Sequence, residues 1–355
     1  MNVKINAKVL EWARREAGYT IDEIANHLDI EPERYAKWET TSNNDMPWGK
    51  LKDISNQYKR QLAVFFLPKV PPSTQKPSDF RNLRLSSTEL SKETLLAIRR
   101  ARKYLDLSAD MMGKDFWESK YTWMKEAHSP EQLRSRLAIT IADQQSFKYT
   151  SEAFKTWRNR VESILGILVF QFSLPLEEVQ AFCIADTLPF GIVLNSRHPY
   201  TARIFSLFHE LAHIAQARSG ICYPDDLDAN QSFEFFCNDF AGKFLIPDDV
   251  VPLATTIEGL TYYANRLKVS REVILRRNLE RSFISRDLFF ELLSEVRKLP
   301  KLKKSGGAAS TIEKAQTSRG RLFYNIVIQA VKANKLDYNT ASDALGVKLN
   351  YLMYA

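Results

Sequence analysis

The sequence predicts a mainly α-helical protein with one small β-sheet, an α+β fold class. Apolar residues recur at helical spacing over most of the 355 residues. Three short segments between positions 166 and 194 lack that period and are rich in β-branched and aromatic residues. Hydrophobic residues make up 45% of the chain and charged residues 26%, which is typical of a protein that folds around buried cores.

Composition excludes several classes of protein. The longest apolar run, Ile164 to Phe170, is far shorter than the roughly 20 residues that a membrane-spanning helix needs. The residues after Met1 lack the apolar core of a secretory leader. Three cysteines in so long a chain do not indicate a disulfide framework. We therefore expect a cytoplasmic protein with no membrane partner.

Two breaks in composition divide the chain into domains. Residues 68–77 contain four of the fourteen prolines and fit neither a helix nor a central strand. Residues 300–310 are small and basic, as in a flexible connector. The predicted parts are a first domain at 1–70, a mostly helical connecting region at 71–160, a third domain at 161–299 and a small helical C-terminal module at 311–355.

The first domain is predicted to contain five helices. The first runs from Ala7 to Ala17 and ends at Gly18, and Thr20 with Glu23 forms a capping box for the second. The others are expected at residues 31–38, from Pro47 and from about Arg60. This arrangement resembles the Xre or lambda-repressor type of helix-turn-helix domain, whose third helix normally enters the DNA major groove.

The third helix leaves two uses of that domain open. Arg34 and Lys37 are its only basic residues, and they are the candidates for contacting DNA or a partner protein. Glu31 and Glu33 place carboxylates where DNA phosphates would approach. Residues 1–70 carry a net charge of only 11 − 10 = +1, whereas residues 301–355 carry 9 − 3 = +6 of the chain's +8. DNA binding and protein recognition through residues 1–70 therefore remain alternatives.

A weak internal repeat occurs at residues 25–30, 264–269 and 342–347. Each copy has a small residue, then Leu three positions later, then Ile or Val two positions after that. The pattern predicts a helix corner in which the residue after Leu adopts a turn conformation. The alternative is three ordinary helix corners in a mostly helical protein.

The middle of the chain is predicted to combine helices with a small sheet. Residues 88–165 have helical spacing and indicate several consecutive helices. Residues 166–172, 179–184 and 190–194 follow as three predicted strands. Helical periodicity returns at residues 201–217, so the three strands precede a long apolar helix.

That helix contains the motif His-Glu-Leu-Ala-His at residues 209–213. A spacing of four places His209 and His213 on one helix face, able to reach one metal ion, with Glu210 directed at a water on that ion. Neutral imidazole suits Zn²⁺, and a carboxylate that is not a ligand can take the proton of such a water. Only five histidines occur in the chain. The alternative is two hydrogen-bonded histidines on a core helix.

A catalytic zinc needs a third protein ligand, and the helical stretch 232–247 offers one. Glu234 is an isolated acid on its aromatic first half, and Asn238 lies one turn later, placed to hold a ligand or the backbone. Competing ligands are Cys222, Cys237, Asp225, Asp226 and Asp228. A thiolate would make the zinc less Lewis acidic and suit a structural site.

Three blocks in this region resemble the ImmA/IrrE family of metallopeptidases. They are Phe182–Asp186 followed by Gly191–Asn195, then Arg203–His213, then Glu234–Ala241 leading to Leu245–Pro247. The resemblance covers residues 160–295 and includes Ser270, which would cap the family's trailing helix. Phe208 departs from the smaller residues frequent before the motif, which bears on the width of the zinc pocket.

The resemblance implies a zincin-like domain with one Zn²⁺ per chain. In the family the ligands are the two histidines and the later glutamate, here His209, His213 and Glu234, with Glu210 as general base. Asp186 is, with Asn238, a candidate for supporting these ligands. Family members often carry an N-terminal Xre-type domain near toxin–antitoxin loci, and they are similar to enzymes that cut a repressor.

Two functions follow as hypotheses. The first is a zinc endopeptidase that cleaves a repressor or antitoxin-type protein, with an extended substrate added to residues 190–194 as an edge strand. The second is a helix-turn-helix transcriptional regulator or antitoxin component whose zinc site is structural or vestigial. Candidates for stabilising the oxyanion are Tyr200, Arg203, His198 and Tyr223, and the sequence does not select among them.

Overall fold

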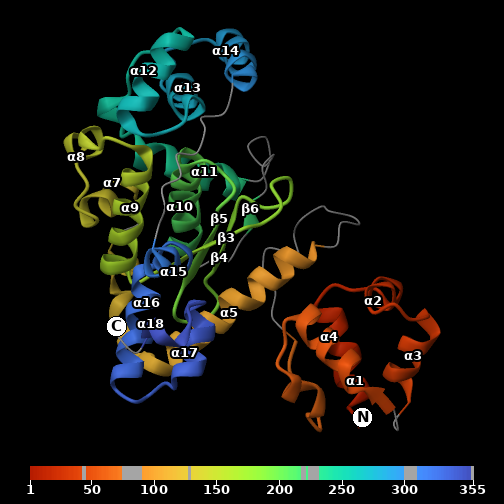
Figure 1. Cartoon of the computed structure of the whole chain (residues 1–355). Helices are drawn as coiled ribbons and strands as arrows, with labels where there is room; N and C mark the ends of the chain where they lie inside the picture. Colours follow the sequence, from red (N-terminus) through yellow and green to blue (C-terminus); the bar gives the residue numbers. More distant parts are fainter. Residues whose placement is uncertain are drawn as a thin grey trace. The chain divides into compact units, whose positions relative to one another are not determined.

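A computed structural model describes most of the chain, which divides into two compact units (Figure 1). The described residues are 1–41, 45–73, 90–126, 129–216, 221–222, 232–299 and 310–352. Most of them are helical, and the strands form two small sheets, which confirms the predicted fold class. Among these residues, no helix is both long and apolar enough to cross a membrane.

Within the described residues, the first unit contains four complete α-helices, a short 3₁₀ helix and a pair of three-residue strands. In chain order these are β1 (Asn2–Lys4), α1 (Ala7–Glu16), α2 (Ile21–His27), α3 (Pro32–Thr40), β2 (Asp45–Pro47), α4 (Trp48–Tyr58) and η1 (Leu62–Phe66). The unit also includes α5 (Lys92–Met112) as far as Arg100. The capping box of Thr20 and Glu23 is present as predicted.

Two features of the first unit differ from the prediction. The fifth helix, expected from about Arg60, is only the 3₁₀ segment η1, because five residues before Pro68 give little room for α-helical hydrogen bonds. The antiparallel pair β1–β2 was not predicted, since three residues are too short to show an alternating pattern. The assignment of this unit to the Xre type remains a prediction.

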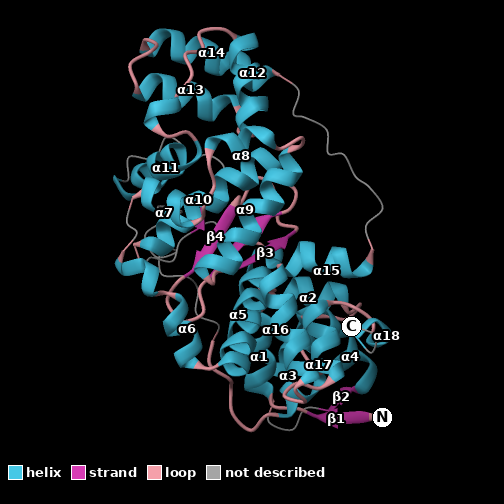
Figure 2. Ribbon diagram, turned by 90° about the vertical axis from the view of Figure 1, so that its left-hand side faces the viewer, coloured by secondary structure: helices cyan, strands magenta, loops and turns pink. Residues whose placement is uncertain are grey.

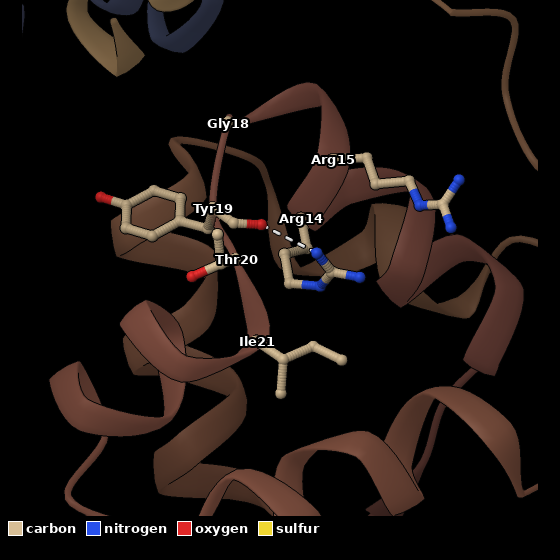
Figure 3. Close-up of a pocket in the computed structure, with 6 residues that line it drawn as sticks. All are labelled: Arg14, Arg15, Gly18, Tyr19, Thr20 and Ile21. Carbon is tan, nitrogen blue, oxygen red and sulfur yellow. Dashed lines mark hydrogen bonds between the residues drawn. The ribbon is translucent and has the colours of Figure 1, made fainter. Parts of the chain in front are cut away.

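Polar groups hold the centre of this unit together. The hydroxyls of Tyr35 and Tyr58 are 2.7 Å apart in the core. The Arg14 guanidinium donates two hydrogen bonds to the Glu39 carboxylate, at 2.8 and 2.9 Å, and a third to the carbonyl of Tyr19 (Figure 3). The hydrogen bond to Glu39 raises the pKa of Arg14. Arg14 therefore links α1 to α3, and its guanidinium is occupied by these structural hydrogen bonds.

The described part of the second unit begins at Ala101 within α5 and contains the remaining helices. The predicted run of helices at 88–165 corresponds to α5, α6 (Lys114–Lys120), η3 (Thr122–Lys125), α7 (Pro130–Arg136), α8 (Ile141–Ser146) and α9 (Thr150–Leu165). The later helices are α10 (Tyr200–Ala215), α11 (Ser232–Leu245), η5 (Asp248–Val250), α12 (Ile257–Leu267), α13 (Arg271–Glu280), α14 (Arg286–Lys298), α15 (Thr311–Arg319), α16 (Arg321–Lys332), α17 (Tyr338–Leu345) and α18 (Leu349–Leu352).

One sheet of four strands lies inside this unit (Figure 2). Its strands are β3 (Leu168–Phe172), β4 (Ala181–Ile184), β5 (Gly191–Asn195) and β6 (Ile221–Cys222), in the spatial order β3-β5-β4-β6. The first three match the predicted segments, whereas the two-residue β6 was not predicted. β3 is parallel to β5, and the other pairs are antiparallel.

The predicted edge strand is wrong, because β5 lies between β3 and β4. Every residue of β5 is buried, as expected for a central strand covered on both faces. The sequence predicts that residues 190–194 are extended, but it does not specify that β4 pairs with the side of β5 away from β3. An added peptide therefore cannot pair with β5.

The free side of β3 is covered by the C-terminal helices. The hydroxyl of Ser318 in α15 donates to the carbonyl of Gln171, and the Gln171 amide donates to the carbonyl of Thr317. Residues 311–352 thus pack within the second unit. The boundaries of the four proposed domains remain predictions, and the expected connector at 300–309 lies outside the described residues.

The three copies of the internal repeat form the same type of helix C-terminal cap. Asp29, Lys268 and Gly346 all have positive φ, at 52°, 57° and 65°. In each copy the amide of the final Ile or Val donates to the carbonyl of the small residue five positions earlier, at 3.1 to 3.2 Å. This is the 6→1 hydrogen bond of a Schellman cap. The turn predicted after Leu is confirmed in all three copies.

Candidate metal centre

The His-Glu-Leu-Ala-His motif lies on α10, which is buried on nearly all sides. The helix packs against β4, β5, α9 and α11. His209 is 4% exposed, and Glu210 and His213 are fully buried. A helix that is apolar all round belongs in a core. Polar side chains at this depth need partners, and Glu234 and Asn238 of α11 provide them.

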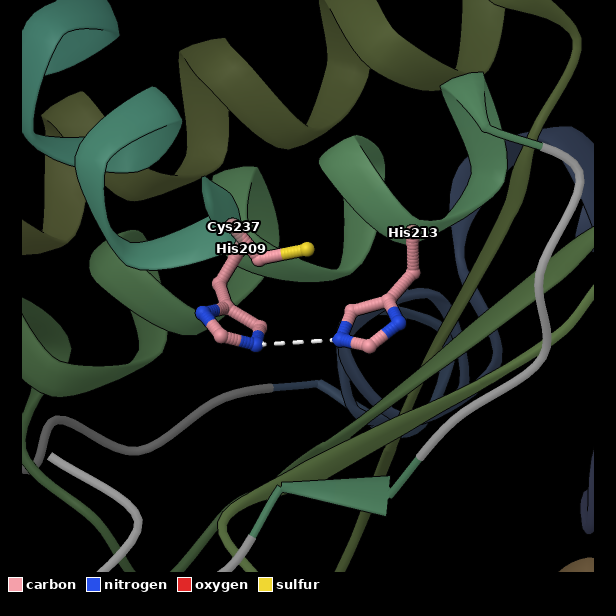
Figure 4. A group of neighbouring side chains, drawn as sticks. All are labelled: His209, His213 and Cys237. Carbon is pink, nitrogen blue, oxygen red and sulfur yellow. Dashed lines mark hydrogen bonds between the residues drawn. The ribbon is translucent and has the colours of Figure 1, made fainter. Parts of the chain in front are cut away.

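Two imidazoles and a carboxylate meet between α10 and α11. The Nε2 atoms of His209 and His213 are 3.1 Å apart. Glu234 places one carboxylate oxygen 3.1 Å from the Nε2 of His209 and the other 3.3 Å from the Nε2 of His213. The structure thus brings the three predicted ligands together at one point, and Figure 4 shows the two rings facing each other.

Asn238 orients the first of these rings. Its Oδ1 lies 2.9 Å from the Nδ1 of His209. Because an amide oxygen can only accept a hydrogen bond, Nδ1 of His209 is the donor in this contact. Nε2 is the nitrogen that faces His213 and Glu234, and it is the one that would bind a metal. This contact is the one that a residue supporting His209 would make, and the role of Asn238 at a metal site stays a prediction.

The surroundings of His213 and Glu234 shift the pKa values of both groups. Burial lowers the pKa of His213, but hydrogen bonds to Cys237 and Glu234 and the nearby charge of Glu210 outweigh it and raise the pKa to about 11. Burial raises the pKa of Glu234, but the hydrogen bonds with both histidines lower it to about 2. The cluster therefore attracts positive charge.

These donor atoms fit a single zinc ion. Tetrahedral Zn²⁺ with donors at about 2.0–2.1 Å would separate any two of them by about 3.4 Å. The observed separations are 3.1, 3.1 and 3.3 Å. Two imidazole nitrogens and a carboxylate oxygen are also the donor types of catalytic zinc sites. The residues present therefore fit the metal that the sequence predicts.

Glu210 lies beside the cluster. It follows His209 on α10, and its negative charge contributes to the raised pKa values of both His213 and Cys237. A carboxylate in a buried site next to metal ligands is placed to exchange protons with a bound molecule.

Cys237 also belongs to this cluster. Its sulfur and one nitrogen each of His209 and His213 lie within 4.8 Å of one another. In Figure 4 the sulfur points toward the space between the two rings. From the sequence, Cys237 is only a competing ligand, although its position three residues after Glu234 already places both side chains on one face of α11.

A family comparison covers this part of the chain. Residues 162–278 match the family model of the IrrE N-terminal-like domain, Peptidase_M78. The match contains all of the cluster residues and supports a metallopeptidase domain of the ImmA/IrrE type, as the three sequence blocks implied. No protein of curated function and no solved structure matches the chain.

The trailing helix of this domain begins as the resemblance implied. Ser270 caps α13 and accepts a hydrogen bond from the amide of Val273.

Phe208 and Asp186 have contacts that the sequence could not predict. The Phe208 ring stacks on Phe244 with centroids 3.9 Å apart and meets the Trp157 ring edge-on at 5.5 Å. It thus fills the core between α9, α10 and α11. Asp186 forms a 2.7 Å ion pair with Arg102 of α5. The role of Asp186 at the metal site remains untested.

The remaining candidates are only partly described. Arg203 donates to the Gln171 side chain, and its guanidinium lies 3.9 Å from the centre of the Tyr200 ring, so both residues are engaged in packing. The candidates Tyr223, Asp225, Asp226 and Asp228 and the side chain of Cys222 lie outside the described residues. His198 is described, but nothing places it at the cluster.

In the first unit, Arg34 and Lys37 are exposed on α3, as a recognition role requires. The Arg34 guanidinium lies over the Trp38 ring at 5.9 Å. Glu31, the N-cap of α3, and Glu33, in its first turn, are exposed as well.

Proposed function

We propose that the protein is a zinc-dependent endopeptidase that cleaves a specific regulatory protein of the repressor or antitoxin type. The observation that supports this most is the meeting of His209, His213 and Glu234 at separations that suit one zinc ion, with Glu210 beside them. The match to a peptidase family over the same residues supports it independently. The type of target rests on the family resemblance alone.

When bound, zinc would polarise the scissile carbonyl and make a water at the site more acidic. The chain's own groups would do the rest. Glu210 would take the proton of the attacking water on a carboxylate oxygen and then deliver it to the nitrogen of the leaving amine. Asn238 would keep His209 in the tautomer whose Nε2 lone pair faces the ion.

An extended substrate would lie along the edge of the sheet formed by β4 and β6. The other edge, β3, is covered by α15, and β5 is a central strand. β6 pairs with β4 only at Ala181 and Phe182. β4 also packs against α10, so a peptide on this side would run close to the metal cluster.

The decisive experiment compares the wild-type protein with Glu210→Gln. Both proteins are added to the proteome of the cells from which the sequence comes, and new N-termini are mapped by mass spectrometry. We expect wild-type-specific cleavage that falls roughly 10²- to 10⁴-fold in the variant, as is usual when a general base is removed. Zinc content should be equal in both, because Glu210 is not a ligand.

Glu258→Gln, an exposed change on α12, is the matched control and should cleave normally. Absence of zinc, or zinc with no cleavage that depends on Glu210, would contradict the proposal. If Glu210→Gln also performs the cellular task unchanged, the alternative of a helix-turn-helix regulator with a structural zinc site becomes the better account.

A further inference from the structure

The chemistry proposed above uses three protein ligands, yet a fourth donor lies in the same cluster. Cys237 is fully buried on α11, three residues after Glu234. Its sulfur lies within 4.8 Å of the ring nitrogens of both His209 and His213. The His213 ring also hydrogen-bonds to the thiol, so the two groups already interact.

The position of Cys237 on the helix explains how one element supplies two donors. Residues three apart lie on the same face of an α-helix, with Cβ atoms about 5–6 Å apart. Glu234 reaches both histidines from this face, and Cys237 approaches them from the next turn. A tetrahedral zinc with usual Zn–S and Zn–N lengths would separate sulfur from nitrogen by about 3.6 Å. The sulfur, within 4.8 Å of both ring nitrogens, would approach that separation on binding the ion.

The other described free cysteine provides a comparison. Cys183 is buried in β4, and the metal-suited group of the described residues does not include it. Burial alone is common for cysteine. What distinguishes Cys237 is that its sulfur is directed at two imidazole nitrogens which are themselves close enough to share one ion.

We propose that Cys237 is a fourth protein ligand that closes the metal centre in its resting state. The inference rests on the proposed function, since it concerns the same ion. On binding, the sulfur lone pair forms a bond to the ion while the S–H bond breaks and its proton passes to solvent. A site with four protein donors leaves no open position.

The consequence is a built-in block on hydrolysis. The Cys237 sulfur would have to leave the ion and take up a proton before a substrate could be cleaved. The two roles of a zinc site, structural and catalytic, would thus be two states of one centre that differ in the position of a single side chain.

The test uses the full-length protein loaded with Co²⁺, which reports its ligands through its absorption spectrum. The wild type is expected to bind about one cobalt per chain and show a near-ultraviolet sulfur-to-cobalt charge-transfer band. Cys237→Ala should lose this band and still bind cobalt through the other three ligands. Cys237→Ser, which changes the volume least, provides the same test if the alanine variant folds poorly.

Cys183→Ala and Cys222→Ala are the matched controls, and both should keep the band. A wild-type cobalt protein without the band, or a band that survives in Cys237→Ala or disappears in either control, would overturn this inference alone. If the wild type binds no metal, or if metal binding is unchanged when His209 is replaced, the proposed function itself would be wrong. Cys237→Ala is further expected to cleave the target several-fold faster than the wild type.

Discussion

At the scale of single residues, the chemistry of the site depends on which ring nitrogen carries a proton. Imidazole presents two nitrogens, and only the deprotonated one can bind a metal. Asn238 makes that choice for His209 through one hydrogen bond of 2.9 Å. The Nδ1 of His213, in contrast, has no hydrogen-bond partner among the described residues. His209 is therefore the ligand whose orientation can be tested by changing a neighbour.

We expect Asn238→Leu to weaken zinc binding by roughly 10- to 100-fold, because the His209 ring loses the acceptor that orients it. Competition with a chromogenic chelator measures the affinity. Asn238→Asp should restore most of it, since a carboxylate oxygen also accepts from Nδ1. Asp239→Asn, on the same helix but paired with Lys243, is the control and should bind zinc like the wild type. Equal affinity in Asn238→Leu would show that this hydrogen bond is dispensable.

At the scale of elements, the three repeated helix ends share one left-handed residue after Leu, and that residue differs among the copies. The left-handed conformation costs roughly 1–2 kcal/mol for a residue with a Cβ and little for glycine. Gly346 meets that requirement, whereas Asp29 and Lys268 adopt the same conformation at a cost. The fold tolerates this cost because the Leu and Val that flank Lys268 are buried.

Lys268→Gly should be more stable than Lys268→Ala by about 1 kcal/mol, because both lose the side chain but only glycine is unstrained at positive φ. Denaturant midpoints of the full chain provide the comparison. Arg266 is exposed within α12 and serves as the control. There the glycine variant should be less stable than the alanine variant, since glycine is the poorer helix former by about 1 kcal/mol. The same order at both positions would mean that residue 268 is not left-handed.

At the scale of the whole molecule, a buried charge joins the C-terminal helices to the rest of the second unit. Glu162 of α9 accepts hydrogen bonds from the first amides of α16, at Arg321 and Leu322, 2.9 and 3.3 Å away. Arg158, one turn earlier, donates to the carbonyls of Thr317 and Val169. Burial raises the pKa of Glu162 and lowers that of Arg158, and their mutual attraction opposes both shifts.

Glu162→Leu is therefore expected to cost about 3–5 kcal/mol, since it leaves the buried Arg158 without its anion. Glu162→Gln should cost less, because its amide oxygen still accepts from the amides of α16. Urea unfolding measures stability, and limited proteolysis reports whether residues 310–352 come away first. Lys155→Leu, an exposed change on α9, should stay within about 0.5 kcal/mol of the wild type. A similarly small effect of Glu162→Leu would show that the C-terminal helices are held by other contacts.

Sequence reasoning succeeded where the cause is local. The capping box of Thr20 and Glu23, the left-handed turns and the shared face of His209 and His213 all depend on groups three to five residues apart. Propensity and spacing encode such features directly. It failed at η1, β1, β2 and β6, which are too short to show a period.

The amino-acid sequence by itself determined the helices, the three main strands and the motif that nominated the metal ligands. Only the tertiary structure decided which distant groups meet. Glu234 and Asn238 reach His209 from 25 and 29 positions away, and β5 enters the sheet between β3 and β4. The physical reason is that periodicity specifies which face of an element is buried, whereas its partner is selected by the packing of all elements together.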